Sequence, residues 1–159
     1  MTNDLKERFK ATMSQYPAGV VIVTTAGAAG LQGFTATSFS SLSLDPPSVL
    51  VCLARSALCY EAFVQSSHFV VNLIDAADAD LATVFARRGA DKFGSAPYRL
   101  TEHGVPVLED CAAFVECRTS SHFVVGDHAV LVGTVAHTEA RQDREVLVHY
   151  RRQFGRVTL

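Results

Sequence analysis

The longest β-rich stretch of the chain spans residues 112–139 and reads AAFVECRTSSHFVV, GDH, AVLVGTVAHTE. Apolar residues alternate or run together in both arms, as is typical of strands. Gly126-Asp127, between the arms, has the residue types of a tight hairpin turn. The stretch therefore predicts two long strands, at 112–125 and 129–139, paired antiparallel.

The remaining segments also favour strands joined in hairpins rather than strands alternating with long helices. No Gly-x-Gly-x-x-Gly follows a strand, so we expect no Rossmann unit for a nicotinamide. The predicted fold is mainly β, an antiparallel Greek-key barrel with a few short helices. Further strands are expected at 20–26, 31–39, 49–54 and 69–74 and a short final element at 145–150; helices are expected at 4–14, at 56–65 and from Asp78 or Asp80, and residues 87–100 are expected to be irregular.

Composition predicts one globular domain covering residues 1–159. The chain is 48% hydrophobic and 19% charged, which suits a packed core. A net charge of −2 without a basic block gives no basis for nucleic-acid binding. No apolar run approaches the ~18–20 residues that span a bilayer, and the polar N-terminus is unlike a signal peptide. Four cysteines without Cys-x-x-Cys spacing fit free thiols in a cytoplasmic protein.

A hydroxyl-rich stretch, GFTATSFSSLSLDPP, occupies residues 33–47. Many hydroxyls among small residues, without charge until Asp45, suit a site that holds a polar or anionic ligand through backbone N–H and O–H groups. The same pattern is also typical of a Ser/Thr-rich strand that ends at a double proline. The residues alone leave both interpretations open.

Five segments in chain order carry a resemblance to a known family. They are YPAGVVIVTT (16–25), the stretch 33–47, FVVNLI (69–74), GVPVL with FVEC (104–108 and 114–117) and GDH (126–128). Together they resemble the short-chain NAD(P)H:flavin reductases, the reductase components of two-component flavin monooxygenases. The resemblance implies an FMN-binding split barrel that forms a homodimer with sites near the subunit interface. It also implies FMN or FAD as flavin, NADH or NADPH as co-substrate, and a separate flavin-dependent monooxygenase as partner.

The resemblance assigns site residues by their positions in these segments. Thr35, Ala36, Thr37 and Ser38 match a segment that meets the flavin phosphate and ribityl chain, and Ser56 a further phosphate position. Cys52, Leu53 and Ala54 match a strand whose backbone faces the isoalloxazine ring. Phe85, Arg87, Lys92 and Tyr150 match residues around the site, and His128 matches a catalytic histidine near the nicotinamide.

Several of these assignments have a plainer interpretation. Arg87 and Lys92 could equally be solvated loop charges, and a histidine after a turn is usually a polar surface residue. Relatives often have Asn at the position of Thr37 and Gly at that of Arg152. The other histidines lack the spacing of metal ligands, so no metal site is expected; they include His68, His103, His122 and His137.

The predicted function is an NAD(P)H-dependent flavin reductase. The protein would hold nicotinamide and flavin in stacked register, and the reduced flavin would then leave for the monooxygenase. A second hypothesis is a tight FMN-binding electron carrier, or a reductase of another acceptor such as a corrinoid, on the same fold. A third is a structural or regulatory dimer with a degenerate flavin site.

Overall fold

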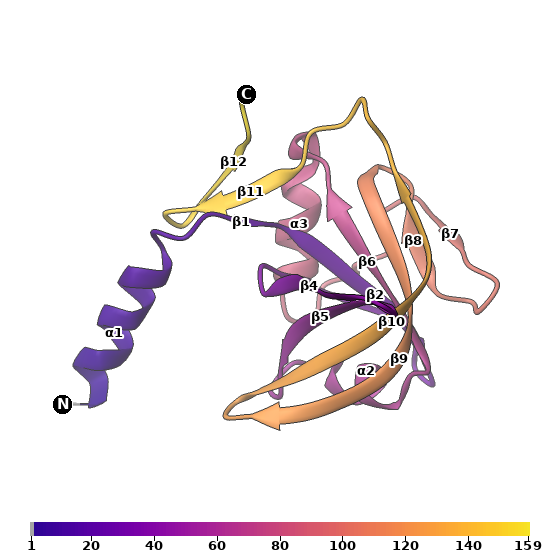
Figure 1. Cartoon of the computed structure of the whole chain (residues 1–159), viewed down its shortest axis with the longest axis horizontal. Coiled ribbons are helices and arrows are strands. Elements are labelled where there is room, and N and C mark those ends of the chain that lie inside the picture. The colour runs from indigo at the N-terminus through magenta and orange to yellow at the C-terminus, as the bar shows by residue number, and fades with distance from the viewer. Residues whose placement is uncertain (1) are drawn as a thin grey trace.

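The long hairpin predicted from the sequence forms the centre of the main sheet. A computed structural model describes residues 2–159 (Figure 1). In it β9 (Cys111–Val125) pairs antiparallel with β10 (His128–Ala140), and Val125 lies opposite His128. Gly126 adopts a φ of 60°, a left-handed conformation that glycine reaches without steric cost. The predicted turn at Gly126-Asp127 is therefore confirmed.

The main sheet has seven strands in the order β3-β2-β6-β9-β10-β5-β4, and every neighbouring pair is antiparallel. The edge strands β3 and β4 are separated in the chain by only Thr37 and Ser38, so the sheet must curl until its two edges meet. This confirms the antiparallel barrel. The strands flanking the central hairpin are β2 (Val21–Gly27), β3 (Gly30–Ala36), β4 (Phe39–Leu44), β5 (Pro47–Ala54) and β6 (His68–Ile74).

Short elements surround the barrel. A small sheet of β1, β11 and β12 lies beside α1, and a β7–β8 hairpin packs against the outside of the barrel. No helix within residues 2–159 is long and apolar enough to cross a membrane. These elements are α1 (Thr2–Met13), β1 (Ala18–Gly19), α2 (Tyr60–Gln65), η1 (Ala76–Asp78), α3 (Ala79–Ala86), β7 (Tyr98–Leu100), β8 (Pro106–Leu108), β11 (Leu147–Tyr150) and β12 (Gln153–Arg156).

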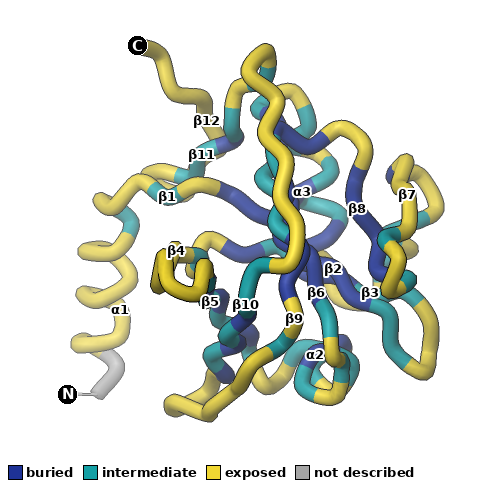
Figure 2. The backbone as a smooth tube through the Cα atoms, turned by 45° about the vertical axis from the view of Figure 1, so that its right-hand side comes forward, coloured by how far each residue is buried: buried dark blue, intermediate teal, exposed yellow. Residues whose placement is uncertain are grey.

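Strand β2 is buried on both faces because the barrel interior covers one and α3 covers the other (Figure 2). Val21 and Val23 belong to the interior cluster, which also contains Phe63 of α2. Ile22 points the opposite way and packs in a second cluster with Phe85 of α3. Alternate residues of a strand face opposite sides, so one apolar run serves two cores and fixes α3 to the barrel.

The buried amide of Asn72 joins three strands. Its Nδ2 donates to the Ile22 carbonyl at 2.9 Å and to Thr24 Oγ1 at 3.2 Å, and its Oδ1 accepts from the Leu108 N–H at 2.9 Å. Asn72 has no exposed surface, so these bonds replace the water it has lost. The side chain therefore ties β8 to β2 and β6.

Four element predictions differ from the structure. Residues 98–100, part of the segment 87–100 that was expected to be irregular, form β7 because they pair with β8. The strand expected at 31–39 ends at Ala36, because the chain bends there so that the Ser38 carbonyl can accept from Cys52 N–H. Residues after the bend form β4, which the sequence did not indicate. The helix expected at 56–65 begins only at Tyr60, after a turn. The final element continues through a turn into a further strand, β12.

Helix α1 packs against little of its own chain. Leu5, Phe9 and Met13 form the apolar stripe of the predicted helix, yet Leu5 is 69% and Phe9 62% exposed. Figure 1 shows the helix projecting from the barrel beside the β11–β12 hairpin. The Arg151 N–H donates to the Ser14 carbonyl at 2.9 Å, directly after the helix. The stripe is thus left uncovered within one chain.

Candidate flavin and nicotinamide site

A cavity of about 650 Å³ lies where the two edges of the sheet meet. Its walls come from β3, β5, the turn after β5 and the segment that follows α3. This size is within the usual range for sites that hold a cofactor. The predicted site residues that line it are Thr35, Ala36, Thr37, Ser38, Cys52, Leu53, Ala54, Ser56, Phe85, Arg87, Lys92 and His128.

The hydroxyl groups of the cavity differ in what they have left to offer a ligand. Thr35 Oγ1 donates to the Ala82 carbonyl of α3, and Ser38 Oγ donates to the Cys52 carbonyl at 3.2 Å. Each can still accept a hydrogen bond but would have to turn to donate one. Thr37 and Ser56 are exposed at the cavity wall. Their hydroxyls are the better placed donors for an anion.

Positive charge dominates the ionised side chains of the cavity. Lys92 Nζ donates to the Gly33 carbonyl at 2.8 Å, and burial lowers the pKa of its ammonium. Arg87 lies on the same wall. Asp91 is the only acid among the described lining residues, and its Oδ1 accepts from the Gly94 N–H. A half-buried ammonium gains stability from a nearby anion, so this wall suits a phosphate.

Arg88 is a lining residue that sequence reasoning missed. Its Nη1 donates to the Ser56 carbonyl at 2.9 Å and so bridges two walls of the cavity. The signal was available, because Arg88 follows Arg87 directly and both come immediately after the helix. Other lining residues outside the predicted set include Leu58, Cys59 and Phe93.

Aromatic rings form the apolar part of the cavity. Phe85 and Phe93 meet edge to face with their centroids 5.2 Å apart. Gly33 allows the close approach of Phe85, because a Cβ at Gly33 would lie 2.7 Å from Cε1 of that ring. Apolar rings beside strand backbone suit a planar ring system.

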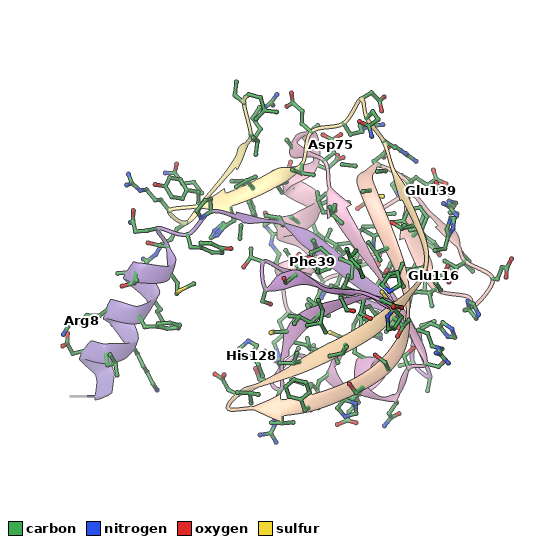
Figure 3. The ribbon with its side chains drawn as sticks, in the orientation of Figure 1. Arg8, Phe39, Asp75, Glu116, His128 and Glu139 are labelled. Carbon is green, nitrogen blue, oxygen red and sulfur yellow. The ribbon has the colours of Figure 1, made fainter. Side chains whose placement is uncertain are left out.

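His128 occupies the rim of the cavity at the start of β10, opposite Ala54 of β5 (Figure 3). Its Nδ1 lies 2.8 Å from Asp127 Oδ1, and the Arg55 N–H donates to the Asp127 carbonyl at 2.9 Å. The hydrogen bond from His128 is the main reason that the pKa of Asp127 is lowered. The ionised carboxylate can only accept, so Nδ1 carries the proton and Nε2 is left for a ligand.

Tyr150 is the one predicted site residue outside the cavity. It lies at the end of β11, and the Arg151 guanidinium sits over its ring at 5.1 Å from the centroid. Arg151 and Arg152 follow with φ values of 49° and 63°, where glycine is usual. Within one chain this hairpin contacts Ser14 and Gln15, directly after α1, rather than the cavity.

A comparison with family models matches residues 13–158 to the flavin reductase like domain. The chain belongs to this family. The chain is 40% identical to a probable flavin reductase from Rhizobium meliloti (strain 1021) over 125 residues. These residues cover 78% of this chain and 40% of the relative. The reductase component of the flavin-dependent trigonelline monooxygenase from Acinetobacter baylyi is 35% identical over 133 residues, 83% of the chain and 42% of the relative. The chain thus spans about two fifths of the length of these two curated relatives.

A solved structure has the same fold as this chain. It is the NADH:FAD oxidoreductase SgcE6 of Streptomyces globisporus C-1027, in complex with NAD and FAD fragments. The TM-score is 0.91 at 28% identity, with 96% of this chain and 93% of that chain covered. The split-barrel architecture implied by the sequence is therefore confirmed.

The arrangement can bind and orient a ligand that has a planar ring and an anionic tail. The aromatic rings and the β5 backbone suit the ring, while Lys92, Arg87 and Arg88 suit the anion. No three His, Cys, Asp or Glu side chains within residues 2–159 converge as metal ligands. The four cysteines are free. The residues present thus fit a flavin, which when bound would supply the redox chemistry.

Proposed function

We propose that this protein is an NAD(P)H-dependent flavin reductase that uses FMN or FAD and supplies the reduced flavin to a separate monooxygenase. The observation that carries the proposal is the single cavity where an excess of cations, aromatic rings, strand backbone and His128 come together. The SgcE6 complex with NAD and FAD fragments and the monooxygenase component from Acinetobacter support the same chemistry.

In this proposal each part of the cavity wall has a separate task. Lys92, Arg87 and Arg88 hold the flavin phosphate with Ser56 and Thr37. The backbone of Cys52, Leu53 and Ala54 lines the ring, and Phe85 closes the apolar side. His128, whose Nδ1–H donates to Asp127, offers the Nε2 lone pair as an acceptor, or its ring face, to the nicotinamide. Holding donor and acceptor in register is the protein's main contribution to rate.

We further propose that two copies of the chain form a homodimer. The exposed apolar side chains of α1 and β4 and the tip of the β9–β10 hairpin support this, because a monomer seldom exposes so many together. Tyr150 could contribute to a site only in such a dimer, since it lies outside the cavity of its own chain. The exposed side chains are Leu5, Phe9, Met13, Leu42, Leu44, Phe123, Val124 and Val125.

The test is oxidation of NADH and of NADPH by the purified protein while FMN or FAD is titrated. We expect turnover that rises and saturates with added flavin, because flavin is an exchanging substrate in this proposal. Flavin that stays bound through gel filtration, without turnover of either nucleotide, would favour the electron carrier instead. The absence of both flavin binding and turnover would indicate a degenerate site. Light scattering during gel filtration measures the oligomeric state in the same experiment.

A further inference from the structure

Two histidines and a buried glutamate meet on the outer face of the barrel, away from the cavity. The imidazole rings of His68 and His103 are stacked, with centroids 3.8 Å apart and planes 15° apart. His103 Nδ1 lies 3.1 Å from Glu116 Oε1, and His68 Nδ1 lies 3.0 Å from Ser67 Oγ. Glu116 is only 7% exposed, and the His103 ring is the hydrogen-bond partner of its carboxylate.

This cluster joins the β7–β8 hairpin to the sheet. His68 is on β6 and Glu116 on β9, whereas His103 is in the turn between β7 and β8. Thr101 shapes that turn, since its N–H donates to the Val105 carbonyl and its carbonyl accepts from the Gly104 N–H. Figure 3 shows Glu116 and Glu139 along the same strand pair as His128 but away from its hairpin end.

The hairpin in turn anchors one wall of the flavin cavity. Segment 87–93 lines the cavity and leads within a few residues into β7. The Phe93 ring, which lines the cavity, meets Tyr98 of β7 edge to face at 5.6 Å. If the hairpin leaves the sheet, this wall loses its support on one side.

The charged groups around His68 come from each element packed against it. Strand β9 supplies Glu116 and, directly opposite His68 in register, Arg118. The β7–β8 turn supplies Glu102 and His103, and β10 supplies His137 opposite Glu116. Strand β2 and the end of α2 supply only hydroxyls there, from Thr25 and Ser66.

We propose that His68, His103 and Glu116 form a pH-dependent contact, which holds the β7–β8 hairpin on the sheet and releases it when His68 gains a proton. One imidazolium in the stack is compensated by the Glu116 carboxylate. A second imidazolium would place two positive rings face to face, with Arg118 opposite His68. Within residues 2–159, Glu116 is the carboxylate hydrogen-bonded to the stack. The proposal concerns the hairpin itself and stands apart from the identity of the ligand.

The direction of the pH effect follows from His68. Burial, and then the charge of His103, lower the pKa of His68 from its usual 6.5. The docked hairpin therefore binds this proton less readily than the released one. Docking is fully stable above about pH 6.5 and loses stability as the pH falls toward the lower pKa of the docked state.

Amide hydrogen exchange of the whole protein, between pH 7.5 and 5, tests whether this contact releases the hairpin. After correction for intrinsic exchange rates, we expect protection of residues 98–108 to fall by up to about tenfold per pH unit below 6.5, since one proton is taken up on release. Residues 87–97 should follow, while β9 and β10 should not. His68→Phe, which stacks but cannot titrate, should abolish the acid effect, and the exposed control His122→Gln should leave it unchanged.

Two results would overturn the proposal. One is equal protection of residues 98–108 at both ends of the pH range in the unaltered protein. The other is an acid effect that persists in His68→Phe. If that variant does not fold, His68→Gln asks the same question, since an amide suits the partly buried site and also cannot titrate.

Discussion

His128 Nδ1 and Asp127 Oδ1 are 2.8 Å apart at the rim of the cavity. The contact joins adjacent residues at a hairpin turn, so the geometry depends on the turn rather than on a distant element. Asp127 belongs to the turn that the sequence predicts, and its carboxylate also accepts a hydrogen bond from the imidazole.

Replacing His128 should weaken nicotinamide use and spare flavin binding. We expect His128→Ala to raise the apparent KM for NADH or NADPH by roughly tenfold, the cost of one hydrogen bond in a site. Asp127→Asn should have a smaller effect, because its amide can still accept from Nδ1. Steady-state kinetics and flavin fluorescence titration measure the two properties. An unchanged KM in His128→Ala, matching the exposed control His122→Ala, would remove His128 from the site.

Removing the Lys92 ammonium should discriminate between phosphorylated and unphosphorylated flavin. Lys92→Met should weaken FMN by roughly tenfold or more and riboflavin little, because a charge-assisted hydrogen bond contributes about 1.5–3 kcal/mol. Titration of flavin fluorescence gives both dissociation constants. Lys10→Met, on exposed α1, is the matched control. Equal losses for FMN and riboflavin would mean that Lys92 does not contact the phosphate.

A methyl group at Gly33 should disturb the cavity wall. The new Cβ would lie 2.7 Å from the Phe85 ring and 3.1 Å from the Val23 carbonyl. We expect Gly33→Ala to lower the free energy of unfolding by about 1–3 kcal/mol and to weaken flavin binding. Gly155→Ala meets nothing within 4 Å and serves as control. Denaturant unfolding compares the stabilities of the two variants, and titration of flavin fluorescence compares their flavin binding. Equal stabilities would show that Phe85 moves aside freely.

Truncating Asn72 should destabilise the barrel without touching the cavity. Asn72→Ala leaves the Leu108 N–H and the Ile22 carbonyl without their side-chain partner in a buried place. We expect a loss of about 3 kcal/mol in the free energy of unfolding, from cavity formation and unpaired polar groups together. Urea unfolding measures it. A loss no larger than that of the exposed control Gln142→Ala would contradict the role given to Asn72.

Thiol labelling should distinguish Cys52 from the other cysteines. Burial raises the pKa of Cys117 to about 12 and raises those of Cys59 and Cys111. Cys52 is only partly buried and lines the cavity. Iodoacetamide at pH 8 should therefore modify Cys52 first, and bound FMN should slow the reaction. Mass spectrometry locates the label; no protection by FMN would place the flavin elsewhere.

The sequence predicted the central hairpin because each strand carries a long apolar pattern and Gly126-Asp127 interrupts it. It did not predict β4, because Ser40, Ser41 and Ser43 dilute the alternation, and the break at Thr37-Ser38 depends on a hydrogen bond to Cys52 on another strand. Most site residues were placed by resemblance rather than by residue chemistry.

Other features depend on contacts between segments far apart in the chain. The Arg88 bridge to Ser56 spans 32 positions, and the His68–His103 stack spans two elements with no shared motif. Buried polar groups such as Asn72 look like ordinary strand residues in the sequence. Only the fold shows which partners they meet.

Anaerobic stopped-flow spectroscopy is the most direct test of flavin reduction in the cavity. Protein with FMN or FAD is mixed with NADH or NADPH, and the visible absorption of oxidised flavin is followed. We expect bleaching whose rate saturates with nicotinamide, is far above the rate without protein, and is slowed in His128→Ala. Bleaching no faster than in the protein-free mixture, with either nucleotide and either flavin, would contradict it.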